Sequence, residues 1–197
     1  MTARLDLKWR RYAVSTLGLA NGASVLDIAC GTGDFLRMLR SQQYQAIGAD
    51  FSFGMLQRSH EQNLIQCDAN KLPFPSQTFQ GATCGFALRN FVDLNTVFSE
   101  IARVLKPNGC LAMVEISRPK SPIIAKAHAL YFDNIMPAMG SIIAHSNAYK
   151  YLSASTAYLP SEVDLRSMLA NTGFKSIEIK YFMFGSAQVI SATRELR

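Results

Sequence analysis

The sequence predicts an α/β domain with a seven-stranded, mostly parallel sheet, helices on both faces and an antiparallel hairpin at its C-terminal end. From Ser24 to Ile116, short apolar runs alternate with segments of helical spacing, which is typical of parallel strands covered on both sides. Beyond Gly173, two β-rich runs, 176–184 and 186–194, flank a turn around Gly185 and Ser186, which indicates the hairpin.

Five apolar runs supply the predicted parallel strands, and the segments between them supply the helices. Lys106 to Gly109 combine basic, proline and glycine stop signals, so we expect a helix from Asn95 to end there and the next strand to begin at Cys110. The other predicted helices cover 35–40, 55–61 with a start near Phe53, and 161–171. The five strands are SVLDIA (24–29), QAIGAD (45–50), NLIQCD (63–68), ATCGFA (82–87) and CLAMVEI (110–116).

Length and composition predict one soluble domain spanning 1–197. The 197 residues are 49% hydrophobic and 17% charged, which suffices for one well-buried core. There is no apolar run of about 18 residues and no apolar stretch behind the basic N-terminus, so we expect neither a membrane span nor a secretory signal, and a cytoplasmic protein. The segment 118–160 breaks the pattern, and we expect inserted helices there that cover a substrate site.

The net charge bears on the partners that the protein can bind, and the cysteines and histidines bear on disulfides and metal sites. The net charge of +6 favours polyanions, nucleic acid or anionic lipid, without choosing between them; Arg4, Lys8, Arg10 and Arg11 cluster near the start. The four cysteines lie far apart without a C-x-x-C pair, so we expect free core thiols. With only three histidines and no close His/Cys spacing, no metal site is expected.

The most informative motif is VLDIACGTGD, from Val25 to Asp34, in which a predicted strand leads through Gly31 and Gly33 into a helix. Glycines at this place let the backbone approach a nucleotide-like ligand. The dinucleotide fingerprint G-x-G-x-x-G would need glycine where Leu36 stands, and it normally lacks an acid at the place of Asp27, so NAD is disfavoured. A phosphate-binding P-loop is excluded, because no G-K-[ST] follows the glycines.

Polar residues also follow the next predicted strands. Asp50 ends the second strand, where a carboxylate can accept hydrogen bonds from both hydroxyls of a ribose, and its alternative role is a cap for the following helix. Asp68, after the third strand, is placed to meet an adenine edge, and residues 85–90 end the fourth strand. We therefore expect four strand ends to converge on one crevice.

These residues resemble the class I methyltransferases that use S-adenosylmethionine, and more closely the ubiquinone/menaquinone biosynthesis C-methyltransferase (UbiE) family. VLDIACGTG and RVLKPNG identify only the superfamily, whereas GFALRN, EISRP and YKYL together are selective. The matching motifs occur in the family's order between Val25 and Phe174: VLDIACGTGD, GADFSFGML, LPFPSQTF, GFALRN, RVLKPNG, VEISRP, the P-x-x-G of 137–140, YKYL and TGF.

The resemblance implies a Rossmann-like, doubly wound sheet, S-adenosyl-L-methionine as cofactor and C-methylation of a quinol ring. It places Arg89 and Asn90 at the substrate as catalytic residues, with Arg89 stabilising a developing phenolate or orienting water; the alternative is an Arg89 that only ties loops together. It assigns cofactor binding to Asp27, Ala29, Gly31, Thr32, Gly33, Asp50, Phe51, Asp68, Ala69 and Gly85.

The base that activates the quinol is left open. His128 and His145 titrate in the right range but belong to no family motif, and Tyr149 and Tyr151 are candidates for lining the substrate pocket or for core packing. Family members usually carry a longer N-terminal segment ahead of the Trp-Arg seen here as Trp9-Arg10, so part of a substrate cover is expected to be missing.

The expected partner is a small prenylated quinol. Because its tail lies in a membrane, we hypothesise peripheral contact with the inner face of the membrane through basic and apolar residues of 118–160, and also a homodimer. The alternatives are a methyltransferase of the same fold acting on another small aromatic or lipid-like acceptor, and a catalytically weak cofactor-binding subunit. Nucleic acid is disfavoured as substrate, because the fourth strand lacks an Asn-Pro-Pro-aromatic or Asp-Pro-Pro-aromatic motif.

Overall fold

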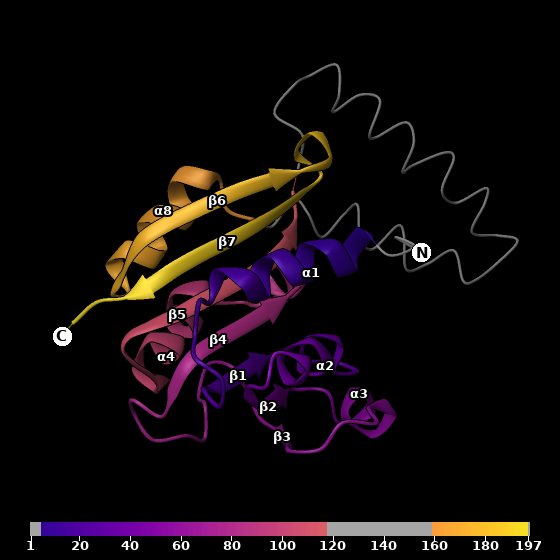
Figure 1. Ribbon diagram of the computed structural model, residues 1–197. Helices are drawn as coiled ribbons and strands as arrows, with labels where there is room; N and C mark the ends of the chain where they lie inside the picture. The colour runs from indigo at the N-terminus through magenta and orange to yellow at the C-terminus, as the bar shows by residue number, and fades with distance from the viewer. Residues whose placement is uncertain (1–4, 118–158, 197) are drawn as a thin grey trace, which may run out of the picture.

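The computed structural model describes residues 5–117 and 159–196, and its centre is a seven-stranded sheet of order β3-β2-β1-β4-β5-β7-β6 (Figure 1). The first five strands are parallel, and β7 pairs antiparallel with both β5 and β6. This arrangement confirms the predicted fold class. The strands are β1 (Ser24–Ile28), β2 (Gln45–Asp50), β3 (Leu64–Gln66), β4 (Phe79–Gly85), β5 (Leu105–Ile116), β6 (Phe174–Phe182) and β7 (Ala187–Arg194).

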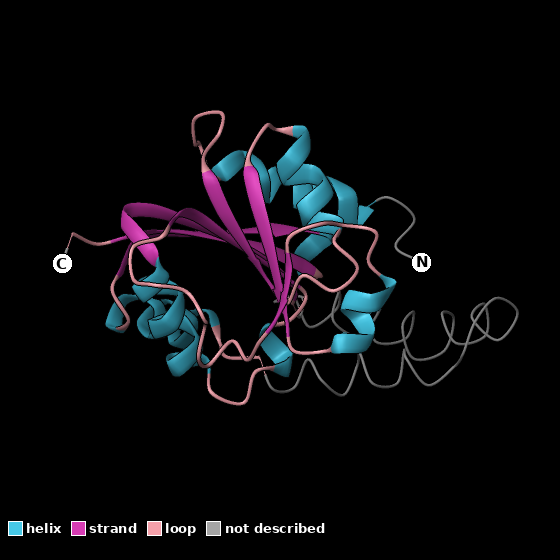
Figure 2. Ribbon diagram, turned by 90° about the horizontal axis from the view of Figure 1, so that it is seen from below, coloured by secondary structure: helices cyan, strands magenta, loops and turns pink. Residues whose placement is uncertain are grey.

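Helices cover both faces of the sheet (Figure 2). They are α1 (Leu5–Thr16), α2 (Asp34–Ser41), α3 (Phe53–Arg58), α4 (Leu94–Val104) and α8 (Glu162–Asn171), with short 3-10 turns η1 (Leu88–Asn90) and η4 (Met183–Gly185). Side chains of α4 and α8 belong to one apolar core, and those of α1 and α2 belong to the other. Strand β5 contributes side chains to both cores. Met113 packs in the first core and Val114 in the second, because successive side chains of a strand point to opposite faces of the sheet.

Most predicted elements are present, and two differences have clear physical reasons. Helix α4 ends at Val104 rather than beyond it, and β5 begins at Leu105 instead of Cys110. Leu105 already pairs with Phe79, and the register then shifts until Gly81 pairs with Cys110, so the predicted stop signals form an irregularity inside the strand.

The second difference is α1, which was not predicted. Its buried residues Trp9, Ala13 and Val14, followed by Leu17, recur at helical spacing, but the basic residues between them mask that pattern.

All four cysteines are free thiols, as predicted; Cys30 and Cys84 are buried and the other two are half-buried. Within residues 5–117 and 159–196, no helix is long and apolar enough to cross a membrane.

The chain order of the strands determines where a site can form. From β1 the chain moves outward through β2 to β3, and then returns to place β4 on the other side of β1. Loops leaving the carboxyl ends of β1 and β4 therefore diverge to opposite faces of the sheet. In open α/β sheets such a switch point leaves a crevice in which ligands bind.

Helix α8 offers a direct test of the packing. Leu169 is 0% exposed and Val163 is 75% exposed on the same helix. Leu169→Ala should lower the free energy of unfolding by about 2–5 kcal/mol, because it opens a cavity in the core. Val163→Ala should change it by no more than about 0.5 kcal/mol. Urea unfolding measures both, and equal effects would contradict the packing described here.

Candidate functional site

A cavity of about 600 Å³ lies at the carboxyl ends of β1, β2, β3 and β4, at the switch point. The convergence of four strand ends predicted from the sequence is thus present as geometry. Two of the predicted site residues, Gly33 and Arg89, are not among its lining residues. The others line it: Asp27, Ala29, Gly31, Thr32, Asp50, Phe51, Asp68, Ala69, Gly85 and Asn90.

The turn after β1 depends on glycine because of its neighbours in the protein. Gly31 and Gly33 both have positive φ, +56° and +88°. A Cβ at Gly33 would lie 2.4 Å from Cγ of Glu61, and one at Gly31 would lie 3.3 Å from the terminal methyl carbon of Met55. The packed 59–61 segment and the backbone conformation therefore already require glycine at position 33.

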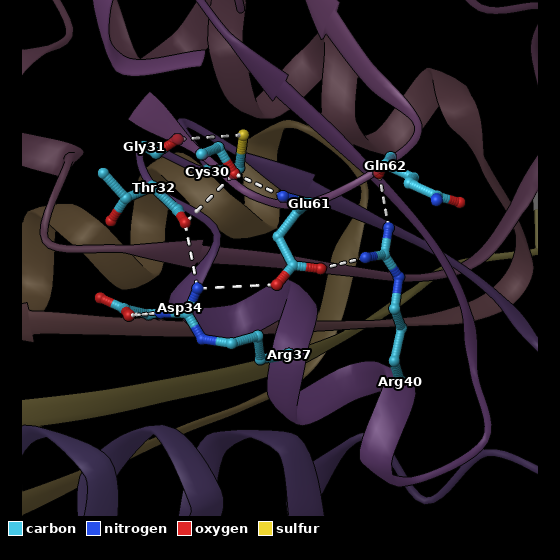
Figure 3. A network of polar contacts seen from close by, with 9 residues as sticks. Cys30, Gly31, Thr32, Asp34, Arg37, Arg40, Glu61 and Gln62 are labelled. Carbon is cyan, nitrogen blue, oxygen red and sulfur yellow. Dashed lines mark hydrogen bonds and ion pairs between the residues drawn. The ribbon is translucent and has the colours of Figure 1, made fainter. Parts of the chain in front are cut away.

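Glu61 joins this turn to helix α2 (Figure 3). Its carboxylate forms an ion pair with Arg40 and approaches Arg37 at 3.6 Å, while the Ser59 hydroxyl donates to the Thr32 carbonyl at 3.2 Å. Arg37 also pairs with Asp34 in the first turn of α2. The segment after α3 thereby holds the turn after β1 from outside the cavity.

Asp50 holds the same turn from inside. One of its carboxylate oxygens accepts the Gly31 N–H at 2.7 Å, and the other accepts the Ser52 N–H at 2.8 Å. The acid at the tip of β2 thus ties two loops of the cavity together. An ionised carboxylate has about four acceptor positions, so both oxygens retain capacity for a ligand.

Asp27 is a buried acid beneath the cavity, only 1% exposed. One oxygen accepts the Thr83 hydroxyl at 2.8 Å, and the other, Oδ2, is buried without a hydrogen-bond partner. Burial raises the pKa of Asp27 to about 7, opposed by the Thr83 hydrogen bond and the charge of Arg10. An unsatisfied buried oxygen of this kind is suited to receive a donor from a ligand.

Two non-glycine residues at the cavity have left-handed backbone conformations. Ala29 follows β1 with φ +52°, and Phe86 follows β4 with φ +59°. Bulky side chains are rarely found there, and such conformations concentrate at sites where the backbone is held for function.

Arg10 is a lining residue that the site prediction missed. It reaches the cavity from α1, where its guanidinium carbon lies 4.8 Å from the centre of the Phe35 ring and 5.0 Å from that of Phe86. The Trp-Arg motif at positions 9 and 10 was noted, but without α1 nothing in the sequence pointed it at the strand ends. Helical spacing in 9–17 is the signal that would have found helix α1, although not the cavity that Arg10 faces.

Arg89 and Asn90, the predicted catalytic pair, face different surroundings. Asn90 lines the cavity. The Nη1 of Arg89 donates to Oε1 of Glu115 at 2.5 Å, in an ion pair whose acid is 0% exposed. Burial raises the pKa of Glu115, and the charge of Arg89 opposes that rise. The pair joins the end of β4 to the end of β5.

Acidic residues outnumber basic residues among the described residues that line the cavity. Four aspartates line it, Asp27, Asp34, Asp50 and Asp68, and Arg10 is the one basic residue among the described lining residues. Such a site favours a ligand that is cationic overall.

The candidate base residues His128 and His145, as well as Tyr149 and Tyr151, lie outside the described residues, as does nearly all of the expected insertion at 118–160.

Comparisons with known proteins agree with this architecture. Over 98% of its length, the chain is 32% identical to the ubiquinone/menaquinone biosynthesis C-methyltransferase UbiE of Geobacter sulfurreducens, covering 80% of that protein. It is 34% identical to the demethylmenaquinone methyltransferase of Desulfitobacterium hafniense, over 98% of this chain and 82% of that one.

A solved S-adenosylmethionine-dependent methyltransferase from Aquifex aeolicus shares the fold, with a TM-score of 0.69 at 18% identity over 98% of this chain and 94% of the other. Residues 1–194 match the sequence model of the ubiE/COQ5 methyltransferase family. The chain therefore belongs to the ubiE/COQ5 methyltransferase family.

Proposed function

We propose that this protein transfers a methyl group from S-adenosylmethionine to a ring carbon of a quinol in menaquinone or ubiquinone biosynthesis. The observation that carries the proposal is the family match over residues 1–194, together with relatives named as quinone C-methyltransferases. The acidic cavity at the switch point agrees with it, because S-adenosylmethionine carries two positive charges and one negative charge.

The described residues fit this cofactor. The cavity volume of about 600 Å³ is in the range of small-molecule sites. The turn at Gly31 brings backbone close to the cavity, Asp50 retains acceptor positions for ribose hydroxyls, and the unpartnered Oδ2 of Asp27 suits a cationic donor. Asp68 is proposed to accept from the adenine amino group, alongside the other cofactor-binding residues named from the sequence.

When bound, the cofactor supplies a methyl group on a positively charged sulfur, open to attack by an electron-rich carbon. The protein's part is to hold the two reactants in line, which in well-aligned systems corresponds to effective concentrations of about 10⁵ M or more. A quinol carbon becomes nucleophilic when a neighbouring hydroxyl loses its proton, and the ring regains aromaticity when the methylated carbon releases its own.

Arg89 and Asn90 are proposed to act on the quinol oxygens. A guanidinium has five N–H donors, and the Glu115 pair occupies only one side of it, so Arg89 can orient a water or stabilise a phenolate while Glu115 holds it in place. Asn90, on the cavity wall, is proposed to hold a ring oxygen through its amide.

The site of action is also a proposal. A prenyl tail would lie in a membrane, so we propose a cytoplasmic protein that contacts the inner face of the membrane peripherally, and a homodimer. The net charge of +6 supports attraction to anionic lipid. Binding to anionic vesicles that persists unchanged at high salt, or equal binding to neutral vesicles, would contradict that electrostatic basis.

The function is tested by incubating the purified protein with S-adenosylmethionine and a reduced demethylmenaquinone or demethylubiquinone. Mass spectrometry should show one added methyl on the ring and an equal amount of S-adenosylhomocysteine. Cofactor binding without turnover on either quinol would favour another acceptor or a weakly catalytic subunit. The oxidised quinones serve as controls and should remain unmethylated, because they lack the electron-rich ring.

The role of Arg89 requires a paired test, since removing it alone leaves Glu115 buried and unpaired at a cost of about 3–5 kcal/mol. Arg89→Gln together with Glu115→Gln removes both charges. If Arg89 acts on the substrate, this double variant should fold and bind cofactor normally but lose turnover by about 100-fold or more. Turnover close to that of the unaltered protein would instead assign Arg89 to structure alone.

Asp27 should make cofactor binding depend on pH. Its raised pKa means that its ionisation destabilises the ligand-free fold, a contribution that grows as pH rises from about 4 through about 7. A cationic ligand favours the ionised form, so affinity should rise about tenfold or more between pH 5.5 and 7.5, with release of a proton. Calorimetry in two buffers measures both, and Asp27→Asn should flatten the profile. A profile in the unaltered protein as flat as in the variant would refute this linkage.

A further inference from the structure

The turn η4 between β6 and β7 exposes two large apolar side chains. Phe184 is 83% exposed and Met183 is 49% exposed, and both have left-handed backbone conformations, with φ of +55° and +47°. Bulky residues are seldom found in that conformation, which suits glycine or asparagine better. The backbone of the turn therefore gives no reason for apolar side chains here, and strained positions of this kind concentrate at functional sites.

Hydrogen bonds fix this turn to the end of the sheet. The Ser186 N–H donates to the carbonyl oxygens of Phe182 and Met183, both at 3.1 Å, and the Ser186 carbonyl accepts the Ser117 N–H at 2.9 Å. The Ser117 hydroxyl donates to the Gly185 carbonyl at 2.6 Å. The two exposed side chains are thus presented to solvent by a backbone that is already ordered, which lowers the cost of binding a partner.

Basic side chains lie beside the base of the turn. Lys180 of β6 has its Nζ 4.2 Å from the centre of the Tyr12 ring, and that ring packs edge-on against Phe182 at 5.4 Å. Lys8 and Arg11 are exposed residues of α1, and Lys8 lies one turn before Tyr12 on the same face of the helix. The N-terminal end of α1 and the turn η4 lie on the same side of the molecule (Figure 1).

Positive and negative charge occupy different parts of the carboxyl edge of the sheet. The turn lies at this edge, because Ala187 at the start of β7 pairs with Ile116 at the end of β5. Three of the four cavity aspartates belong to β1, β2 and the segment after β3, toward the other end of the strand order. On the nearby elements, Asp6 faces a basic neighbour of α1 at 4.0 Å, and Glu178 lies two residues farther from the turn than Lys180. An anionic surface would therefore be attracted to the β6–β7 end of this edge.

We propose that Met183 and Phe184 insert into an anionic lipid bilayer while Lys8, Arg11 and Lys180 contact its headgroups. Exposed apolar side chains beside basic ones fit such a surface, since apolar burial and attraction to anionic lipid act together. The lipid contact stands on these five residues alone. Its use, which is to bring the cavity edge to the membrane where a prenylated quinol would lie, rests on the proposed function. The surface lies outside the segment 118–160, in which the sequence favoured a membrane contact.

Co-sedimentation with lipid vesicles tests the apolar part of this surface. The unaltered protein should bind vesicles of phosphatidylglycerol and phosphatidylcholine in equal parts about tenfold or more tightly than vesicles of phosphatidylcholine alone. Phe184→Asn suits the left-handed backbone and should weaken binding to the anionic vesicles about tenfold, because it removes the apolar side chain. Leu196→Asn is the matched control, since Leu196 is 69% exposed at the opposite edge of the sheet, and it should leave vesicle binding unchanged.

A pair of charge variants tests the basic part. Lys8→Gln combined with Arg11→Gln should weaken binding to the anionic vesicles about tenfold or more, and high salt should largely abolish the difference from the unaltered protein. Lys106→Gln combined with Lys175→Gln removes the same charge from exposed residues at the opposite edge and should have a much smaller effect. Equal losses in the two double variants would mean that net charge alone attracts the protein to lipid.

Phe184→Trp reports insertion directly. The one tryptophan of the sequence, Trp9, is only 6% exposed, so a second tryptophan in the turn is a distinct probe. Anionic vesicles with brominated acyl chains should quench the fluorescence of Phe184→Trp much more than that of the unaltered protein, because bromine quenches an indole that reaches the acyl chains.

The contrary results are distinct. Equal quenching in both proteins, or absence of binding of the unaltered protein to anionic vesicles, would overturn the proposal even if another variant does not fold. Equal vesicle binding by Phe184→Asn and Leu196→Asn would place the lipid contact elsewhere. A dimer that dissociates in Phe184→Asn without loss of vesicle binding would assign the turn to a second copy of the chain. Vesicle binding with quenching at position 184, but without methylation of any quinol, would reject the proposed function and leave the lipid contact standing.

Discussion

The turn after β1 is the constraint on which the site depends. It must pass through left-handed conformations at Ala29, Gly31 and Gly33 to leave the sheet and enter α2. Asp50 binds it from the cavity side through the Gly31 N–H, and Glu61 packs on it from the other side while pairing with Arg40. Because these contacts come from β2 and from the segment after α3, the shape of the turn is set before any ligand arrives, which reduces the ordering cost of binding.

The parts of this molecule that depend on local pattern could be predicted from the sequence. Apolar runs gave the parallel strands, and the acids Asp50 and Asp68 at their ends were placed at one sheet edge because parallel strands share that edge. The ends of elements were less predictable. Leu105 joins β5 through its pairing with Phe79, a contact between distant residues that no local stop signal reports.

The remaining parts depend on contacts across the chain. Glycine motifs indicate close approach, but only packing shows that a protein side chain, Glu61, is the neighbour of Gly33. The buried partner of Arg89 is Glu115, which lies on a different strand, and this pairing follows from the adjacency of β4 and β5. Arg10 reaches the cavity only because α1 packs beside α2, so its position depends on tertiary structure that periodicity does not encode.

The position of β7 between β5 and β6 bears on how the chain folds during synthesis. Among the described residues, strand β6 (Phe174–Phe182) pairs only with β7 (Ala187–Arg194), which follows it in the chain. Until β7 has left the ribosome, β6 cannot join the sheet, and β5 keeps an open edge. The described sheet is therefore complete only after Arg194 has been synthesised, and until then β5 presents an open edge that can pair with another chain.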